Sequence, residues 1–395
     1  MDELVRLVEA MDCEVCGRID QELQSPNPAT YVGSGKLEEL SFHAVELEAS
    51  YIVFLETLSP AQLKNITNAV DVMVLDRTGL ILEIFARRAR TREAKLQVES
   101  ANLQYMLPRL VGMRTSLGRQ GGTSGSLSNK GQGEKQIELD RRHIEKRIYE
   151  VKRELEAIEH NREVQRKARN RSNLPKVAMV GYTNAGKSTL MNRLLELSGK
   201  EEEKKVFEKD MLFATLDTSI RRIFCEDKKD FLLSDTVGFV SDLPHSLIKA
   251  FRSTLDEVRY ADLLLVVVDA SDPRFAEQID ITEDTLKELG ANTVPKLYVM
   301  NKADRIDVIP KNPDSDRIYI SAANGNGVDR LLSAIKAKVY SDNKVIECLI
   351  PYTQGNIVSF LKENANILEL EYLEDGIKIV ADCPEWVRGK INIDY

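Results

Sequence analysis

The chain has 395 residues, 43% hydrophobic and 30% charged, which excludes a wholly disordered or collagen-like protein and suits two to four domains. The net charge is −8, yet residues 86–172 hold 21 Lys or Arg against 11 Asp or Glu, a local excess of +10. With five cysteines, no run of 18 apolar residues and no apolar leader, we expect a cytoplasmic protein without integral membrane insertion. Peripheral membrane association stays open.

Residues 1–85 predict a small parallel α/β subdomain. Two short runs rich in β-branched residues, Tyr51–Leu55 and Val70–Leu75, are typical of buried strands. Between them, Leu58–Ala69 predicts a helix, because Pro60 suits a first turn.

Residues 86–172 predict a long antiparallel helical hairpin. Apolar residues recur at spacings of three, four and seven in two stretches, first Leu96, Leu103, Met106 and Leu110, then Ile137, Ile144, Ile148, Val151, Leu155 and Ile158. Each stretch gives one apolar stripe, so the two helices should pack on each other. The second, about 134–170, would be roughly 55 Å long.

The tip of this hairpin, residues 108–133, has seven glycines, six Ser or Thr and no acid. Such a segment cannot build a core. Its four basic residues are candidate RNA contacts: Arg109, Arg114, Arg119 and Lys130. A plain solvent loop is the alternative, and the surrounding charges also suit two solvated helices.

Residues 173–341 predict a doubly wound, mostly parallel sheet. Asn173–Pro175 ends the hairpin, and five short apolar runs then alternate with helical spacers. These runs are Val177–Val180, Phe231–Leu233, Leu263–Val268, Leu297–Met300 and Ile318–Ile320. Residues 342–395 predict a small α+β domain, with strand-like runs at 345–350, 367–373 and 376–379 and a helix at 355–364.

The segment Gly181–Ser188 has the pattern G-x-x-x-x-G-K-S between an apolar strand and a helix, which predicts a phosphate-binding loop. Its backbone amides should surround phosphate oxygens, Lys187 should bridge the β- and γ-phosphates, and Ser188 should hold Mg²⁺. The expected phosphate-binding residues are Gly181, Tyr182, Thr183, Asn184, Ala185, Gly186, Lys187, Ser188 and Thr189.

Guanine specificity is predicted by Asn301-Lys-Ala-Asp304, which follows a strand. The Asp304 carboxylate can accept two hydrogen bonds from guanine, whereas adenine lacks that donor pair. Asn301 should tie this loop to the phosphate loop, and the stem of Lys302 should pack on the base. Ser321 and Ala322 lie where a backbone amide can reach the guanine oxygen.

Two further segments should meet Mg²⁺ and the γ-phosphate. Asp235 should reach the metal through water, and the Gly238 amide should sense the γ-phosphate. Thr215 should coordinate Mg²⁺ only when GTP is bound, although Thr218 is close by. The expected catalytic set is Lys187, Thr215 and Gly238.

The residue after Gly238 is Phe239, where Ras-type GTPases have a water-orienting glutamine. A phenyl ring cannot polarise water, so we expect slow intrinsic hydrolysis, about 10⁻⁴ to 10⁻² s⁻¹. Hydrolysis must therefore use another group, a partner, a metal ion or assistance from the substrate. Asn184 is one candidate, as a contact for K⁺.

The sequence resembles the HflX family of translational GTPases over nearly its whole length. The resemblance is carried by Asn27–Lys36, Asp76–Thr78, Arg90–Val98, Leu107–Leu110, Gly131–Arg142, Gly181–Ser188 and Asp235–Phe239. It implies an N-terminal domain with a helical hairpin, then a G domain. It also implies binding to the large ribosomal subunit, with the hairpin directed at rRNA near the peptidyl-transferase region. In the GTP form such a protein would split or rescue stalled ribosomes. The ribosome would in turn stimulate hydrolysis of GTP to GDP.

One alternative function and two weaker motifs remain to be considered. A GTP-gated assembly or signalling switch, in the manner of Obg relatives, would use the same features without splitting ribosomes. Gly33–Lys36 resembles a fragment of a phosphate loop, but Leu37 follows where Ser or Thr is needed. Cys13 and Cys16 have metal-ligand spacing but no second pair, so we expect no zinc site.

Overall fold

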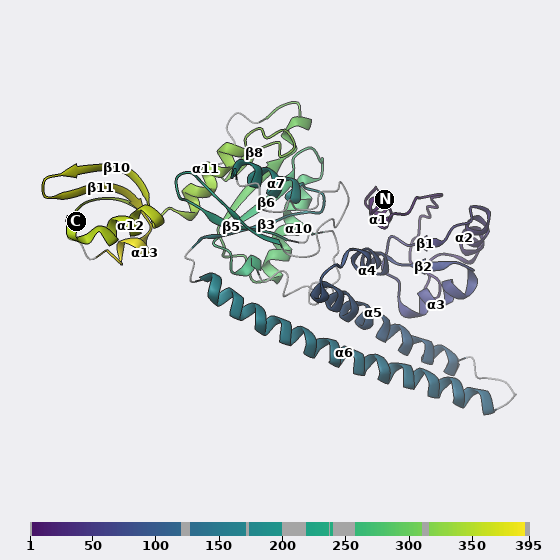
Figure 1. Ribbon diagram of the computed structural model, residues 1–395. Helices are drawn as coiled ribbons and strands as arrows, with labels where there is room; N and C mark the ends of the chain where they lie inside the picture. Colours follow the sequence, from purple (N-terminus) through teal and green to yellow (C-terminus); the bar gives the residue numbers. More distant parts are fainter. Residues whose placement is uncertain are drawn as a thin grey trace. The chain divides into compact units, whose positions relative to one another are not determined.

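The computed structural model describes residues 2–119, 127–170, 174–199, 219–236, 238–239, 257–309 and 316–391 (Figure 1). For residue 2 and for 111–119, 127–137 and 162–170 it describes the backbone alone. The chain forms two compact units, the first within Met1–Glu163 and the second beginning at Val164. No helix in the described ranges is long and apolar enough to cross a membrane.

The first unit opens with a small α/β subdomain. Its elements are α1 (Asp2–Ala10), α2 (Ser34–Glu46), β1 (Tyr51–Val53), α3 (Pro60–Ala69), β2 (Met73–Leu75) and α4 (Arg77–Arg88). The strands β1 and β2 pair in parallel, and a capping box of Ser59 and Gln62 begins α3, with Pro60 in its first turn. The predicted strand–helix–strand unit is confirmed. The helix α4, which was not predicted, crosses the expected boundary between residues 85 and 86.

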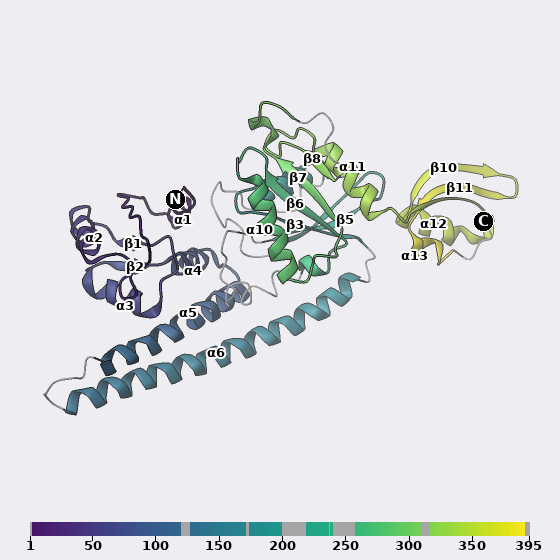
Figure 2. The ribbon, with the colours of Figure 1, turned by 180° about the vertical axis from the view of Figure 1, so that it is seen from behind.

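Two long helices follow, α5 (Arg92–Arg119) and α6 (Leu127–Asn170), and they lie side by side in both views (Figure 2). Glu99 on α5 binds Arg147 on α6 through two hydrogen bonds of 2.6 and 2.9 Å, and Arg92 binds Glu154 at 2.8 Å. The residue numbers rise along α5 as they fall along α6, so the predicted antiparallel hairpin is confirmed.

The bounds of the hairpin tip differ from the prediction. Helix α5 continues through Pro108 to Arg119, and α6 begins at Leu127, so most of the expected loop 108–133 is helical. A proline usually breaks a helix, but here the residues on both sides of it are anchored. Tyr105 donates to Asp76 at 2.6 Å, and Arg109 pairs with the same carboxylate at 3.0 Å.

This pairing corrects the assignment of Arg109 as an RNA contact. Its side chain is only 14% exposed, and its guanidinium also donates to the Tyr105 carbonyl at 2.7 Å. Asp76 is fully buried and accepts further hydrogen bonds from the amides of Leu58 and Gly79. Arg109 therefore joins α5 to the α/β subdomain. The side chains of Arg114, Arg119 and Lys130 lie outside the described residues.

The second unit contains a six-stranded sheet in the order β4-β5-β3-β6-β7-β8. Its elements are β3 (Lys176–Val180), α7 (Lys187–Leu197), β4 (Ser219–Ile223), β5 (Phe231–Asp235), β6 (Leu263–Asp269), α10 (Phe275–Glu288), β7 (Lys296–Asn301), η1 (Ala303–Arg305), β8 (Arg317–Tyr319) and α11 (Val328–Val339). All neighbours pair in parallel except β4 and β5. The predicted doubly wound sheet is confirmed. The edge strand β4 was missed, because its sequence Ser-Ile-Arg-Arg-Ile lacks a continuous apolar run.

The chain then forms the predicted small α+β domain. Its elements are β9 (Lys344–Ile350), η2 (Tyr352–Gln354), α12 (Gly355–Asn364), β10 (Asn366–Leu373), β11 (Gly376–Cys383) and α13 (Glu385–Arg388). The antiparallel sheet has the order β10-β11-β9, and its inner face packs Ile350, Ile379 and Ala381 against Leu361 of α12.

Candidate nucleotide-binding site

The segments singled out in the sequence gather at one edge of the six-stranded sheet. The strands β3, β5, β6, β7 and β8 run in parallel, so the loops after their carboxyl ends lie at the same edge. In open α/β sheets this edge is where ligands bind.

The glycines of Gly181–Ser188 are required by their surroundings. Gly181 has φ of +142°, and a Cβ there would lie 2.1 Å from the Val267 carbonyl oxygen. Gly186 has φ of +90°, and a Cβ there would lie 2.3 Å from Nδ2 of Asn301. The chain can therefore turn tightly after β3 and begin α7 at Lys187 only with glycine at both positions.

Lys187 is the buried cation of this loop. Its residue is 7% exposed, and Nζ donates to the carbonyls of Gly181 at 3.0 Å and Tyr182 at 2.9 Å. Burial lowers the pKa of Lys187 to about 8, and the nearby Asp235 carboxylate opposes this shift in part. A phosphate close to Nζ would favour its charged form.

Ser188 and Asp235 form a pair of oxygen ligands. The Ser188 hydroxyl, in the first turn of α7, donates to Oδ2 of Asp235 at 2.8 Å, and Asp235 is fully buried at the end of β5. Hydroxyl and carboxylate oxygens are the donors that Mg²⁺ prefers, so this pair fits the expected metal. Thr215 lies outside the described residues.

The segment after β5 is bound directly to the phosphate loop. Thr183 N donates to the Phe239 carbonyl at 2.7 Å, and Phe239 N donates to the Gly181 carbonyl at 3.0 Å. Phe239 is 3% exposed, so its ring is a core side chain. At Gly238 a Cβ would lie 3.0 Å from Lys187 Nζ, which places that backbone against the ammonium group.

Asn301 joins the phosphate loop to the segments that follow β7 and β8. Its Nδ2 donates to the Ala185 carbonyl at 2.8 Å, and its Oδ1 accepts from the Ala322 amide at 3.0 Å. The predicted tie between the two loops is present. The Ser321 amide donates to the Asn326 carbonyl within its own loop, so the amides of Ser321 and Ala322 both have partners.

Asp304 is exposed on η1, directly after Lys302, which has φ of +58°. The Lys302 ammonium pairs with Asp269 at the end of β6, at 2.7 Å. Burial raises the pKa of Asp269, but hydrogen bonds from Lys302 and Ser271 outweigh this and hold it below its usual value. The other expected residues, Tyr182, Asn184 and Thr189, are half-buried, and Asn184 has φ of +61°.

Sequence reasoning missed two residues that support this site, Asp269 and Arg193. Arg193, on α7, donates from Nε to the Ala322 carbonyl at 3.2 Å and from Nη2 to the Ala323 carbonyl at 2.6 Å. It thereby fixes the loop expected to face the base. Asp269 ends β6 directly after the unbroken apolar run Leu263–Val268, which was a usable signal, whereas Arg193 lies in an ordinary helical stretch and gave none.

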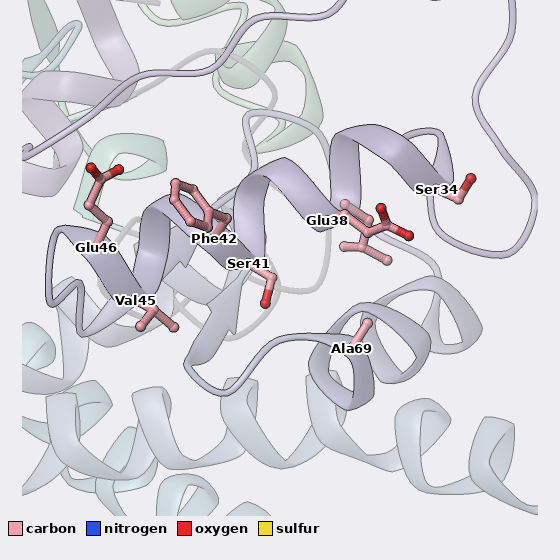
Figure 3. Close-up of a pocket in the computed structure, with 8 residues that line it drawn as sticks. Ser34, Glu38, Ser41, Phe42, Val45, Glu46 and Ala69 are labelled. Carbon is pink, nitrogen blue, oxygen red and sulfur yellow. The ribbon is translucent and has the colours of Figure 1, made fainter.

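The first unit has a groove of different character on α2, closed on one side by Ala69 (Figure 3). It is lined by Ser34, Leu37, Glu38, Ser41, Phe42, Val45, Glu46 and Ala69. Its charged groups are acidic, and the nearby Lys36 pairs with Glu39 at 2.8 Å. This lining does not favour a polyphosphate. The described residues hold no cluster of three or more potential metal ligands among His, Cys, Asp and Glu.

A phosphate loop tied through Asn301 to the loop after β8, beside the Ser188–Asp235 pair, defines a P-loop GTPase domain. Family models agree. The 50S ribosome-binding GTPase model matches residues 176–302, and the models of the GTP-binding GTPase N-terminal and middle regions match residues 1–86 and 88–169.

The chain belongs to the HflX family of GTPases. It is 43% identical over 392 residues to GTPase HflX of Caldanaerobacter subterraneus subsp. tengcongensis, covering 99% of this chain and 89% of the relative. For GTPase HflX of Escherichia coli K12 the identity is 39% over 398 residues, with 98% and 91% covered. The resemblance inferred from the sequence is confirmed, and the protein is a guanine-nucleotide-binding GTPase that hydrolyses GTP.

Solved structures give a more distant match. A GTP-binding protein from the archaeon Sulfolobus solfataricus in complex with GDP is 27% identical, with a TM-score of 0.46, covering 86% of this chain and 95% of that one.

Proposed function

We propose that this GTPase binds the large ribosomal subunit in its GTP form and splits or rescues stalled ribosomes, hydrolysing GTP to GDP and phosphate. The observation that carries this proposal is the Asn301-tied nucleotide site within a segment that matches the 50S ribosome-binding GTPase model. The protein would act in the cytoplasm, where its ribosomal partner is.

In this proposal the segment Gly181–Thr189 holds the phosphates, and Lys187 neutralises charge on the β- and γ-oxygens. Its lowered pKa suits this role, because a desolvated ammonium gains most from a phosphate partner. Ser188, Asp235 and Thr215 would hold Mg²⁺, which when bound neutralises phosphate charge.

The base is read by the loops after β7 and β8. The Asp304 carboxylate would accept the two guanine donors, Lys302 would lie along the base, and Asn301 would fix the loop geometry. The Ser321–Ala322 loop would present an amide to the guanine oxygen. Because the Ser321 amide bonds to Asn326 and the Ala322 amide bonds to Asn301, the Ala323 amide is a further donor to consider.

Hydrolysis would be slow in the protein alone and stimulated by the ribosome. Gly238 would sense the γ-phosphate, and the buried Phe239 ring has no group that could orient water. Asn184 would contact K⁺ beside the phosphates. Hydrolysis compared in KCl and NaCl tests this contact, and equal rates would remove it. A single-turnover rate above roughly 1 s⁻¹ without a partner would contradict slow intrinsic hydrolysis.

The helical hairpin is the proposed ribosome-binding arm. Residues 86–172 carry an excess of ten positive charges, and Arg114 and Arg119 fall in the last turns of α5 while Lys130 falls in the first turn of α6. A basic end on a pair of long helices suits contact with rRNA phosphates near the peptidyl-transferase region.

The second candidate is a GTP-gated assembly or signalling switch that binds rRNA or protein without splitting ribosomes. The same basic hairpin would serve it. Sucrose gradients of whole ribosomes with the protein and a non-hydrolysable GTP analogue separate the two functions. Ribosome splitting predicts more free subunits with the analogue than with GDP. Co-sedimentation with intact particles, and no rise in free subunits, favours the second function.

A further inference from the structure

The phosphate loop contains a buried hydroxyl with no hydrogen bond. Thr183 is 6% exposed, and within the part of the chain that the structure describes its Oγ1 is buried without a partner. A buried hydroxyl in that state costs free energy, and such groups in native structures call for a ligand, a bound water or a catalytic role.

The position of Thr183 indicates which ligand its hydroxyl would bind. Its amide bonds to the Phe239 carbonyl, which fixes it beside the segment after β5. A Cβ on Gly238 would lie 2.8 Å from both Cα and Cγ2 of Thr183, and 3.0 Å from Lys187 Nζ. The Cα and Cγ2 methyl group of Thr183, the Gly238 backbone and the Lys187 ammonium therefore converge on one place. The hydroxyl is on the same Cβ as this methyl group, and one rotation about the Cα–Cβ bond exchanges their positions. If Lys187 and Gly238 hold the γ-phosphate as proposed, Thr183 lies next to it.

We infer that Thr183 is a catalytic residue of GTP hydrolysis, whose hydroxyl contacts both the γ-phosphate and the water that attacks it. A threonine hydroxyl has one donor and two acceptor sites. It would donate to a γ-phosphate oxygen and accept from the water, which is orienting work that the Phe239 ring cannot do. The inference rests on the proposed roles of Lys187 and Gly238 and is independent of ribosome splitting.

The reaction balances without consuming the hydroxyl. The water oxygen forms a bond to the γ-phosphorus, and the bond from that phosphorus to the bridging oxygen breaks. The bridging oxygen leaves with the electron pair as part of GDP. The water proton ends on inorganic phosphate. Thr183 only orients the water, as a positioned hydrogen-bond partner in the transition state.

The test compares Thr183→Val, which keeps the shape but removes the hydroxyl, with Thr183→Ser, which keeps the hydroxyl. Single-turnover GTP hydrolysis should fall about tenfold or more in T183V and stay within about threefold in T183S. GDP affinity should change less than about twofold in both. Equal hydrolysis by T183V and the wild type, with GTP bound, would overturn the inference.

The melting temperature is a second measurement, and it distinguishes a loss of catalysis from a loss of folding. Replacing a hydroxyl that has no partner by a methyl group should leave the melting temperature without nucleotide unchanged or higher. Thr282→Val is the matched control, because Thr282 is 1% exposed but its hydroxyl donates to the Gln278 carbonyl at 2.7 Å, on α10. This control should melt lower and hydrolyse GTP normally. A T183V variant that also melts lower would show that the hydroxyl has a structural partner, which contradicts the inference. Ribosome binding, measured separately, would not be affected by that failure.

Discussion

The phosphate loop and the hairpin are both phosphate-binding candidates, but they are built in opposite ways. In the loop, positions are fixed by short-range geometry, such as the 2.1 Å that would separate a Cβ on Gly181 from the Val267 carbonyl oxygen. Around the hairpin, a +10 charge excess is spread over residues 86–172, and many of the charged side chains pair within the hairpin, as Arg141 does with Glu145. A site that needs exact backbone positions can be recognised in the sequence as a motif, whereas an electrostatic surface shows in the sequence only as an excess of charged residues.

The largest expected effect concerns the nucleotide-binding site. Replacing Asp304 by Asn removes the carboxylate that would accept the guanine donors, so GTP affinity should fall by about 100-fold or more while xanthosine triphosphate binds better. Titration with GTP, XTP and ATP measures the change. An unchanged preference for guanine would remove Asp304 from the base site.

The next effect tests the correction of Arg109 within the hairpin. Replacing Arg109 by Ala leaves the fully buried Asp76 without its cation, which should cost about 3 kcal/mol of unfolding free energy. Urea denaturation of the full chain measures this loss. If Arg109 were instead an RNA contact, the variant would keep its stability and weaken ribosome binding in a salt-dependent way.

A smaller effect concerns the basic residues at the tip of the hairpin. Replacing Arg114, Arg119 and Lys130 together by Ala should weaken binding to the large subunit by about tenfold or more and make its salt dependence shallower. Nucleotide affinity should not change.

Arg141 and Arg142 offer a matched control on α6, because they pair with Glu145 and Glu138 of the same helix. Their replacement by Ala should change the salt dependence less. A salt slope that is the same in the tip variant as in the wild type would mean that the tip does not meet phosphate.

A further prediction concerns Arg193, which supports the loop after β8 in the nucleotide-binding site. Replacing it by Ala frees the carbonyls of Ala322 and Ala323, so GTP and GDP affinity should each fall about three- to tenfold, with less discrimination against inosine nucleotides. Arg193→Lys should restore part of the loss. Wild-type affinity in both variants would mean that the loop holds its shape without Arg193.

The smallest effect concerns Asp269. Because its pKa lies below the usual 3.8, the ionised carboxylate stabilises the fold at neutral pH, and this contribution is lost as the pH falls through the folded-state pKa. Asp269→Asn should therefore be less stable than the wild type at pH 7, and the difference should shrink below about pH 4. Denaturation at both pH values measures the difference in unfolding free energy between the two proteins. A difference that does not change with pH would contradict this role of Asp269.

The sequence by itself determined the parallel sheet, the antiparallel hairpin and the loops around Lys187, Asp235 and Asn301. Unbroken apolar strands, seam spacing and obligatory glycines are local signals, and each reports directly on burial or backbone conformation. Only the tertiary structure decided that α5 continues through Pro108, that Arg109 is internal, and that Arg193 supports the base loop. Those outcomes depend on contacts between residues 33 to 130 positions apart, such as Arg109 with Asp76 and Arg193 with Ala323. No local pattern encodes such a contact, because the same arginine in the same helix is a surface charge until a distant carboxylate or carbonyl is folded against it.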